Sequence, residues 1–322
     1  MKSEKVLILG SNGYIGSALA EALSSEFEVM GCDRYPPSSK TNIKTIVSDY
    51  DDLLITQLGW ADTIILLAGN SSVSSCNDFN DSYNQNVAKF QRLLHKIDGK
   101  GIKLIYASSS SVYSAHGYNE PTISHESDLL GNPINNYDAT KQMVDLIAKR
   151  YMNSFEIYGL RFGTVNGNSP NMRWDLMVNS MVKSAVESGN IHVTNPNVNR
   201  PILAMQDLII GIKGILYNEI PTKGGIYNMA SDNDTVLSIA KNVAAALIQL
   251  NIKVKDIIVH NPIDLNKSEN IPYDFKINSM KFFNKFIYPL NQSFSDDHLF
   301  WNVLCADILK SELKNSIWPS QN

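Results

Sequence analysis

The feature that most constrains the fold is an alternation of short aliphatic runs with longer amphipathic segments in the first half of the chain. Six runs are short and apolar enough to be buried strands, and they span residues 6–9, 27–31, 43–47, 63–67, 103–107 and 155–160. Between them, residues 14–24 and 135–151 carry apolar side chains at helical spacing, such as Ile15 and Leu19. Strand and helix repeated in this way predict an α/β fold, a doubly wound parallel sheet with helices on both faces.

The second half is less regular, which indicates a smaller second domain. Proline and asparagine cluster within residues 166–201 and again within 261–289. A predicted helix at about 205–217 and a short apolar run at 225–230 interrupt this pattern, and we expect both to return to the main sheet. The predicted first domain is therefore 1–167 plus about 205–230, and the discontinuous C-terminal domain is about 168–204 plus 231–322.

Composition and charge exclude several classes of protein. The 322 residues carry a formal net charge of −4, which argues against a nucleic-acid binder because such proteins need a basic patch. The three cysteines form no CxxC and the six histidines show no metal-ligand spacing, so neither a disulfide framework nor a metal site is predicted. No apolar stretch approaches the ~18 residues of a membrane span, and the start has too few apolar residues for a secretory signal. We therefore expect a cytoplasmic protein without a nucleic-acid, membrane or metal partner.

A glycine-rich turn follows the first predicted strand and opens the first predicted helix; it reads Gly10-Ser11-Asn12-Gly13-Tyr14-Ile15-Gly16. Glycines allow a tight turn and a close approach to a pyrophosphate, which the N–H groups of a helix N-terminus bind. This context predicts a Rossmann-type dinucleotide site, with cofactor contacts from Gly10, Gly13, Tyr14, Ile15 and Gly16.

The identity of the dinucleotide depends on the residues that end the second predicted strand. Asp33 lies 17 residues beyond Gly16, where an acidic side chain binds the adenosine ribose diol and repels a 2′-phosphate. Asp33 therefore predicts NAD. The adjacent Arg34 could instead hold a 2′-phosphate, which keeps NADP as an alternative.

Tyr137 and Lys141 stand four residues apart at the start of a predicted helix, so they share one face of it. The preceding strand ends in a serine run at 108–111, at the sheet edge where open α/β folds bind ligands. A carbinol gives hydride to nicotinamide only if its hydroxyl proton leaves as well. We expect Tyr137 to be the base, with its pKa lowered from ~10 by Lys141 and by the positive oxidised nicotinamide.

Over most of its length the chain resembles the extended short-chain dehydrogenase/reductase family, which includes NAD-dependent nucleotide-sugar epimerases and dehydratases. Besides the glycine loop, the segments that carry the resemblance are 47–49, 66–69, 86–87, 106–113, 133–141, 160–167 and 200–207. The resemblance implies an NAD-binding first domain and a nucleotide-sugar-binding C-terminal domain. It implies Ser109 as the catalytic hydroxyl beside Tyr137 and Lys141, both of which also contact the cofactor. It implies further cofactor contacts from Asp49, Tyr50, Leu67, Ala68, Gly69 and Asn86.

The serine run narrows the activity within this family. Ser110 and Ser111 stand where the resembling 4,6-dehydratases carry an acidic pair. The run is more similar to that of a 4-epimerase or a 4-keto-sugar reductase. Our leading hypothesis is an NAD-dependent nucleotide-sugar 4-epimerase that acts through a transient 4-keto sugar. The alternatives are a nucleotide-4-keto-sugar reductase or dehydrogenase that uses NAD(P)(H) and, more remotely, a non-catalytic dinucleotide-sensing protein.

The implied substrate is a nucleotide-diphosphate sugar, whose diphosphate needs charge-assisted donors. Among only six arginines, Arg200 and Arg173 are the candidates, whereas Arg161 ends a predicted strand and is expected to be structural. The remaining predicted substrate-binding residues are Ser71, Ser110, Thr164 and Asp175. Thr164 stands where UDP-glucose 4-epimerases usually carry Asn.

The resemblance also bears on partners and pathway. It implies a homodimer, joined through predicted helices near 79–96 and 135–151. Polysaccharide biosynthesis is the usual destination of the products of such enzymes.

Overall fold

The computed structural model describes residues 4–37, 43–113, 123–218, 224–260, 274–287 and 297–311. Its main feature is a parallel sheet in which seven strands from these residues follow the order β11-β7-β5-β4-β1-β2-β3. The strands are β1 (Lys5–Leu9), β2 (Glu28–Asp33), β3 (Thr45–Val47), β4 (Thr63–Leu66), β5 (Lys103–Ser109), β7 (Ile157–Phe162) and β11 (Gly224–Met229). This sheet confirms the predicted Rossmann-type α/β fold.

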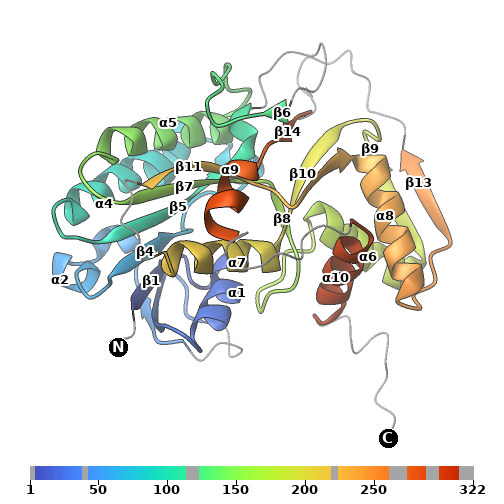
Figure 1. Ribbon diagram of the computed structural model, residues 1–322, viewed down its shortest axis with the longest axis horizontal. Coiled ribbons are helices and arrows are strands. Elements are labelled where there is room, and N and C mark those ends of the chain that lie inside the picture. Colours follow the sequence, from blue (N-terminus) through green and yellow to red (C-terminus); the bar gives the residue numbers. More distant parts are fainter. Residues whose placement is uncertain are drawn as a thin grey trace, which may run out of the picture.

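Helices cover both faces of the sheet, as Figure 1 shows. One face packs against α1 (Tyr14–Leu23) and α7 (Met205–Leu216), and the other against α4 (Lys89–Ile97) and α5 (Asn136–Tyr151). The alternation of side chains along a strand creates the two cores. In β1, Val6 and Ile8 belong to the first core, whereas Leu7 and Leu9 belong to the second.

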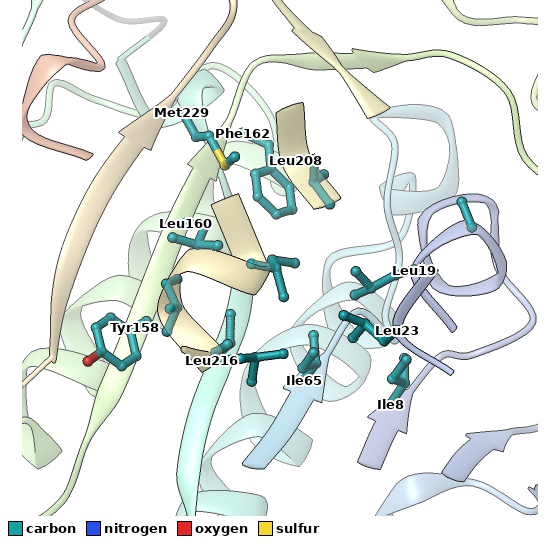
Figure 2. Packing of buried hydrophobic residues seen from close by; sticks show 14 of the residues in the cluster. Ile8, Leu19, Leu23, Ile65, Tyr158, Leu160, Phe162, Leu208, Leu216 and Met229 are labelled. Carbon is teal, nitrogen blue, oxygen red and sulfur yellow. The ribbon is translucent and has the colours of Figure 1, made fainter. Parts of the chain in front are cut away.

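Figure 2 shows the first core, where Ile8 and Ile65 of the sheet lie near Leu19 and Leu23 of α1 and Leu216 of α7. Burial of such aliphatic side chains contributes ~1.5–3 kcal/mol each. This packing, with β11 paired to β7, places α7 and β11 on the main sheet although they follow a long excursion of the chain.

The helix expected near 79–96 is interrupted in the structure. α3 (Phe79–Tyr83) and α4 are joined by a π-helical turn, η3 (Asn84–Ala88), which inserts one wider turn into the helix. The wider turn places Asn86 toward the centre of the molecule, where it is buried. The apolar spacing in the sequence did not reveal this interruption.

The second lobe contains more regular structure than the sequence led us to expect. Its core is formed largely by α6 (Met177–Ser188), α8 (Val236–Gln249) and α10 (Asp297–Leu309). Small sheets complete the lobe, namely β12-β10-β8 and β13-β9, from β8 (Thr164–Asn166), β9 (Asn190–Thr194), β10 (Asn199–Ala204), β12 (Asp232–Thr235) and β13 (Asp256–His260). Figure 1 shows this lobe beside the carboxyl end of the main sheet.

Short elements complete the description. They are α2 (Ile55–Leu58), α9 (Met280–Phe282), β6 (Ile123–Ser124), β14 (Lys276–Ile277), and the turns η1 (Tyr50–Asp52), η2 (Ser74–Cys76), η4 (Ser110–Tyr113) and η5 (Phe283–Ile287). Of the helices in the described ranges, none is both long enough and apolar enough to traverse a membrane.

Candidate active site

A cavity of about 820 Å³ opens at the carboxyl ends of the main-sheet strands. This is the edge at which open α/β sheets bind ligands. The loops after β1, β2, β4, β5 and β7 all contribute to its wall. The cavity gathers nearly every predicted site residue: Gly10, Gly13, Tyr14, Ile15, Gly16, Asp33, Arg34, Asp49, Tyr50, Leu67, Ala68, Gly69, Ser71, Asn86, Ser109, Ser110, Tyr137, Lys141, Thr164, Arg173 and Arg200.

The glycine loop needs glycine at its first and last positions. Gly10 has a φ of +89°, a conformation that L side chains rarely adopt, and a Cβ on Gly16 would overlap the carbonyl oxygen of Gly10. Gly13 is the N-cap of α1, and within the described structure no side chain caps that end and no acidic residue stands in the first turn of the helix. The first turn of α1 therefore forms part of the cavity wall, and the backbone N–H groups of a helix N-terminus are suited to bind an anion.

Asp33 ends β2 beside this loop. One carboxylate oxygen accepts the backbone N–H of Asn12 at 3.0 Å, and the other accepts that of Tyr35 at 3.1 Å. Each oxygen retains acceptor capacity, because a carboxylate oxygen has more than one lone pair. Asp33 is thus fixed in orientation and able to accept from a ribose diol, while its neighbour Arg34 is exposed at the rim.

Asp49 is paired with a lysine that the sequence analysis did not identify. Lys89 of α4 lies 2.5 Å from Oδ2 of Asp49, and the backbone N–H of Asp51 donates to Oδ1 at 3.0 Å. Burial alone would raise the pKa of Asp49, but these donors outweigh it and the pKa is lowered. Lys89 also lines the cavity, so it shares this end of the site with Asp49.

Asn86 braces the loop after β4 against α5. Its amide exchanges hydrogen bonds with the backbone of Asn70, at 2.8 and 3.1 Å, and donates to Oγ1 of Thr140 at 3.1 Å. Gly69 has a φ of +142°, and a Cβ there would lie 2.6 Å from Oδ1 of Asn86. The structure therefore gives Asn86 a bracing position in addition to its place in the cavity wall.

The predicted proton-transfer residues meet at the end of β5. Tyr137 is hydrogen-bonded to Ser109, and the Ser109 hydroxyl also contacts Oγ of Ser111 at 2.9 Å. The Lys141 ammonium donates to the carbonyl of Ala107 at 2.9 Å and lies 5.6 Å from the centre of the Tyr137 ring. The three side chains thus share one corner of the cavity.

The expectation that Lys141 and a bound oxidised nicotinamide lower the pKa of Tyr137 concerns the site with its cofactor, and the groups of this chain by themselves act in the other direction. Enclosure away from water raises the pKa of Tyr137 to about 12, and it is the hydrogen bond to Ser109 and the charge of Arg173 that oppose this rise. The same enclosure lowers the pKa of Lys141 to about 8, against the opposing charge of Asp145. Desolvation is therefore the largest contribution to the pKa of Tyr137 from the chain itself.

A buried polar network lies beneath these residues. Asp145 accepts from Nε of Arg161 at 2.8 Å and from the Tyr106 hydroxyl at 2.9 Å, and it stands one turn beyond Lys141 on α5. Gly159 of β7 lies directly opposite Tyr106 of β5, and a Cβ there would overlap the Tyr106 hydroxyl. The complete burial of Arg161 in this network agrees with the structural role expected for it.

Asp175 does not line the cavity, unlike the other predicted substrate residues. It is exposed and forms a two-pronged pair with Arg173, at 2.5 Å and 3.1 Å. The Asp175 carboxylate pairs with the Arg173 guanidinium and fixes its orientation. Asp175 therefore contacts Arg173, and it is Arg173 that lines the cavity.

Ser108 is a cavity residue that the predictions omitted from the site. Its hydroxyl is buried and has no hydrogen-bond partner in the part of the chain that the structure describes. A buried hydroxyl without a partner costs ~1–3 kcal/mol, so a bound ligand is its natural partner. The serine run itself was the available signal.

Residues 6–230 match the sequence model of the NAD dependent epimerase/dehydratase family. A relative, protein CapI of Staphylococcus aureus, is 30% identical over 235 residues, which are 66% of this chain and 69% of CapI.

Solved structures share the fold. The UDP-glucuronic acid 4-epimerase of Bacillus cereus, in complex with UDP-glucuronic acid and NAD, superposes with a TM-score of 0.74 at 22% identity, over 95% of this chain and 99% of that chain. TunA, an NAD-dependent NDP-hexosamine 5,6-dehydratase of tunicamycin biosynthesis, gives 0.76 at 20% identity, over 97% and 99%. An epimerase and a dehydratase are thus equally close in fold, so the choice between them falls to the cavity.

Proposed function

Because the chain belongs to the NAD-dependent epimerase/dehydratase family, we propose that it is a nucleotide-sugar 4-epimerase. The observation that carries this proposal is the cavity wall around Tyr137. Among the described lining residues the acidic side chains are Asp33, which ends β2, and Asp49, which follows β3. Ser109 ends β5, on the other side of β4 and β1. Dehydration of a sugar needs an acid and a base at the sugar, whereas 4-epimerisation needs one base for one hydroxyl. Around Tyr137 the described lining residues carry hydroxyl groups and no carboxylate, which supports epimerisation over dehydration.

Membership in this family confirms three predictions made from the sequence. The family resemblance is correct, the chain is an enzyme of the short-chain dehydrogenase/reductase type, and its cofactor is NAD. The reaction, the sugar and the roles of individual residues are proposals.

The cavity has the donors and acceptors that NAD requires. The uncapped start of α1 suits the diphosphate, Asp33 suits the adenosine ribose, and Asp49 with Lys89 lies toward the adenine end. We assign Lys141 and Ser108, which line the cavity, to the nicotinamide end. Bound NAD supplies a hydride acceptor that becomes a hydride donor once it is reduced.

The chain's own residues handle the proton. Tyr137 removes the proton of the sugar C4 hydroxyl, and Ser109, already hydrogen-bonded to Tyr137, holds the C4 oxygen in line. Because the cavity holds the pKa of Tyr137 near 12, phenolate formation needs positive charge close by, and Arg173 is a group of this chain that acts in that direction. Tyr137 returns its proton to C4 oxygen after the 4-keto sugar has turned within the cavity.

We assign the substrate diphosphate to Arg173 and Arg200, which line the cavity beside Thr164. Ser71 and Ser110 complete the proposed sugar contacts. The substrate class, a nucleotide-diphosphate sugar, is supported by the B. cereus epimerase, whose structure holds UDP-glucuronic acid. The division into a cofactor domain and a substrate domain, the homodimer, and the role in polysaccharide biosynthesis belong to the same proposal.

The first test is mass spectrometry of dinucleotide released from freshly purified, denatured protein. An epimerase regenerates its cofactor in each turnover, so we expect about one NAD per chain to survive dialysis. Incubation of that protein with UDP-, GDP-, dTDP- and CDP-sugars should then interconvert one pair of 4-epimers without added cofactor.

Other outcomes would favour the alternatives. Protein that consumes added NADH or NADPH with a nucleotide-4-keto sugar, and interconverts no epimers, would be a keto-sugar reductase. Protein that binds NAD but converts no sugar nucleotide of the panel would support a dinucleotide sensor.

A further inference from the structure

Residues 167–173 cross from the second lobe over the glycine loop, and we call this segment the strap. Three side-chain contacts join it to the loop. Asn171 donates to the carbonyl of Asn12 at 2.7 Å, and Ser169 donates to the carbonyl of Tyr14 at 2.6 Å. The Ser169 hydroxyl also lies 2.9 Å from that of Ser17 in α1. The strap is thus bonded along the first turn of α1.

Tyr14 and Asn179 connect the two ends of the strap. The Tyr14 hydroxyl donates to the carbonyl of Gly167 at 2.7 Å, and it accepts from Nδ2 of Asn179 at 3.1 Å. The same Asn179 amide donates to the carbonyl of Arg173 at 2.9 Å and accepts the N–H of Gly167 at 3.0 Å. Tyr14 and Asn179 are both buried, so water does not compete for these bonds.

The strap ends at the side chain proposed to hold the substrate diphosphate. Arg173 lines the cavity, its guanidinium is held by Asp175, and its charge acts on both Tyr14 and Tyr137. A chain of contacts therefore runs from the cofactor loop, through Tyr14 and Asn179, to Arg173. A displacement of the first turn of α1 changes the backbone position of Arg173 unless one of these bonds breaks.

We propose that Tyr14 and Asn179 are positioning residues that couple the two binding regions, so that a nucleotide diphosphate and NAD bind cooperatively. This inference rests on the proposed function, since it takes Arg173 as the diphosphate ligand. The dinucleotide diphosphate orders the start of α1, the strap transmits that order to Arg173, and linkage requires the reverse effect to be equally large. The sugar nucleotide then retains the cofactor during turnover.

The test measures retention of NAD rather than catalysis. Protein purified with its NAD is diluted, and the rate of NAD loss is followed with and without saturating UDP, GDP, dTDP or CDP. In the wild-type protein we expect at least one nucleotide to slow NAD loss by about 5-fold or more. In Tyr14→Phe, which keeps the ring and removes the hydroxyl, that factor should fall toward 1.

Two further variants make the result specific. Asn171→Ala removes a strap contact at an exposed position, so it tests the coupling even if Tyr14→Phe does not fold. Tyr217→Phe removes a hydroxyl that bonds Glu26 outside the described cavity lining, and it should retain the wild-type factor.

The outcomes separate this inference from the proposed function. Failure of all four nucleotides to bind, measured by thermal shift, would overturn the proposed substrate class and the inference with it. A nucleotide that binds but leaves NAD loss unchanged in wild type would overturn the inference alone. An undiminished factor in both Tyr14→Phe and Asn171→Ala would do the same.

Discussion

At the cofactor end of the cavity, residues 10–16 shape the wall as one continuous turn, whereas at the substrate end Ser71, Thr164 and Arg200 come from three separate parts of the chain. The turn at residues 10–16 requires only β1 and α1, which are consecutive in the chain. The substrate end requires the main sheet, β8 and β10 to be folded against one another. Under the proposed function, the glycine turn of the cofactor end depends mainly on local sequence, whereas the proposed substrate contacts depend on tertiary assembly. Changes at these two places should therefore have different consequences.

The largest effect is expected where the two ends meet, at Tyr137. Tyr137→Phe removes the proposed base, and we expect kcat to fall by about 10²- to 10⁴-fold, since proton transfer contributes that much to the rate. KM for the sugar nucleotide should change little, and the purified variant should still contain NAD. Steady-state kinetics with unchanged kcat would remove Tyr137 as the base.

A glycine pair tests the local character of the cofactor end. Gly16→Ala places a Cβ on the Gly10 carbonyl, so we expect the variant to lose most of its NAD. Gly59→Ala is the control and should keep its NAD, because Gly59 is not among the cavity-lining residues and its φ of −68° suits alanine. The measurement is NAD content per chain after purification, and equal contents in the two variants would contradict the geometry.

An arginine and its partner test the assembled character of the substrate end. Arg173→Ala should raise KM for the sugar nucleotide by about 10- to 100-fold, the value of a charge-assisted hydrogen bond, and leave NAD content close to wild type. Asp175→Asn should have a smaller effect on KM, because Asp175 acts only by orienting Arg173. A larger effect of Asp175→Asn than of Arg173→Ala would place the diphosphate elsewhere.

The smallest effect concerns Lys141 and the pH dependence of stability. Burial lowers its pKa from 10.5 to about 8, so between these values the unfolded chain binds a proton that the folded chain does not. The free energy of unfolding therefore rises with pH across that window. We expect the thermal midpoint to rise more in wild type than in Lys141→Met between about pH 8 and 10.5. Parallel curves would mean that Lys141 keeps its ordinary pKa in the fold.

The same contrast explains how much could be predicted from the sequence. The strands of the main sheet, α1, α5 and the glycine loop were predictable because apolar period and turn chemistry are read over adjacent residues. Ser109 was implied by the family resemblance of residues 106–113, which is also a local stretch of sequence. These features hold most of the fold and the cofactor end.

What could not be predicted depends on contacts between distant residues. Lys89 reaches Asp49 across 40 positions, and Asn179 reaches Tyr14 across 165. Asp175 was predicted to bind the substrate. In the structure it pairs with Arg173, two residues before it, and it does not line the cavity. The sequence analysis also did not predict α8, although residues 236–249 lie outside both proline- and asparagine-rich clusters.

Tyr106 and Gly159 stand opposite one another on β5 and β7, and the absence of a side chain at 159 leaves room for the hydroxyl that bonds Asp145. Tyr106 also lines the cavity, but neither residue belongs to the proposed proton-transfer group, and the order in which the two can mutate is restricted. Any larger residue at 159 displaces the Tyr106 hydroxyl, so a smaller residue at 106 has to arise first. That first change removes the Tyr106 hydroxyl, which is one of the donors to Asp145. The buried pair of Asp145 and Arg161 then loses a hydrogen bond that stabilises it. A change at either position alone therefore disturbs the other residue. We expect proteins that descend from this chain either to retain both residues or to replace both.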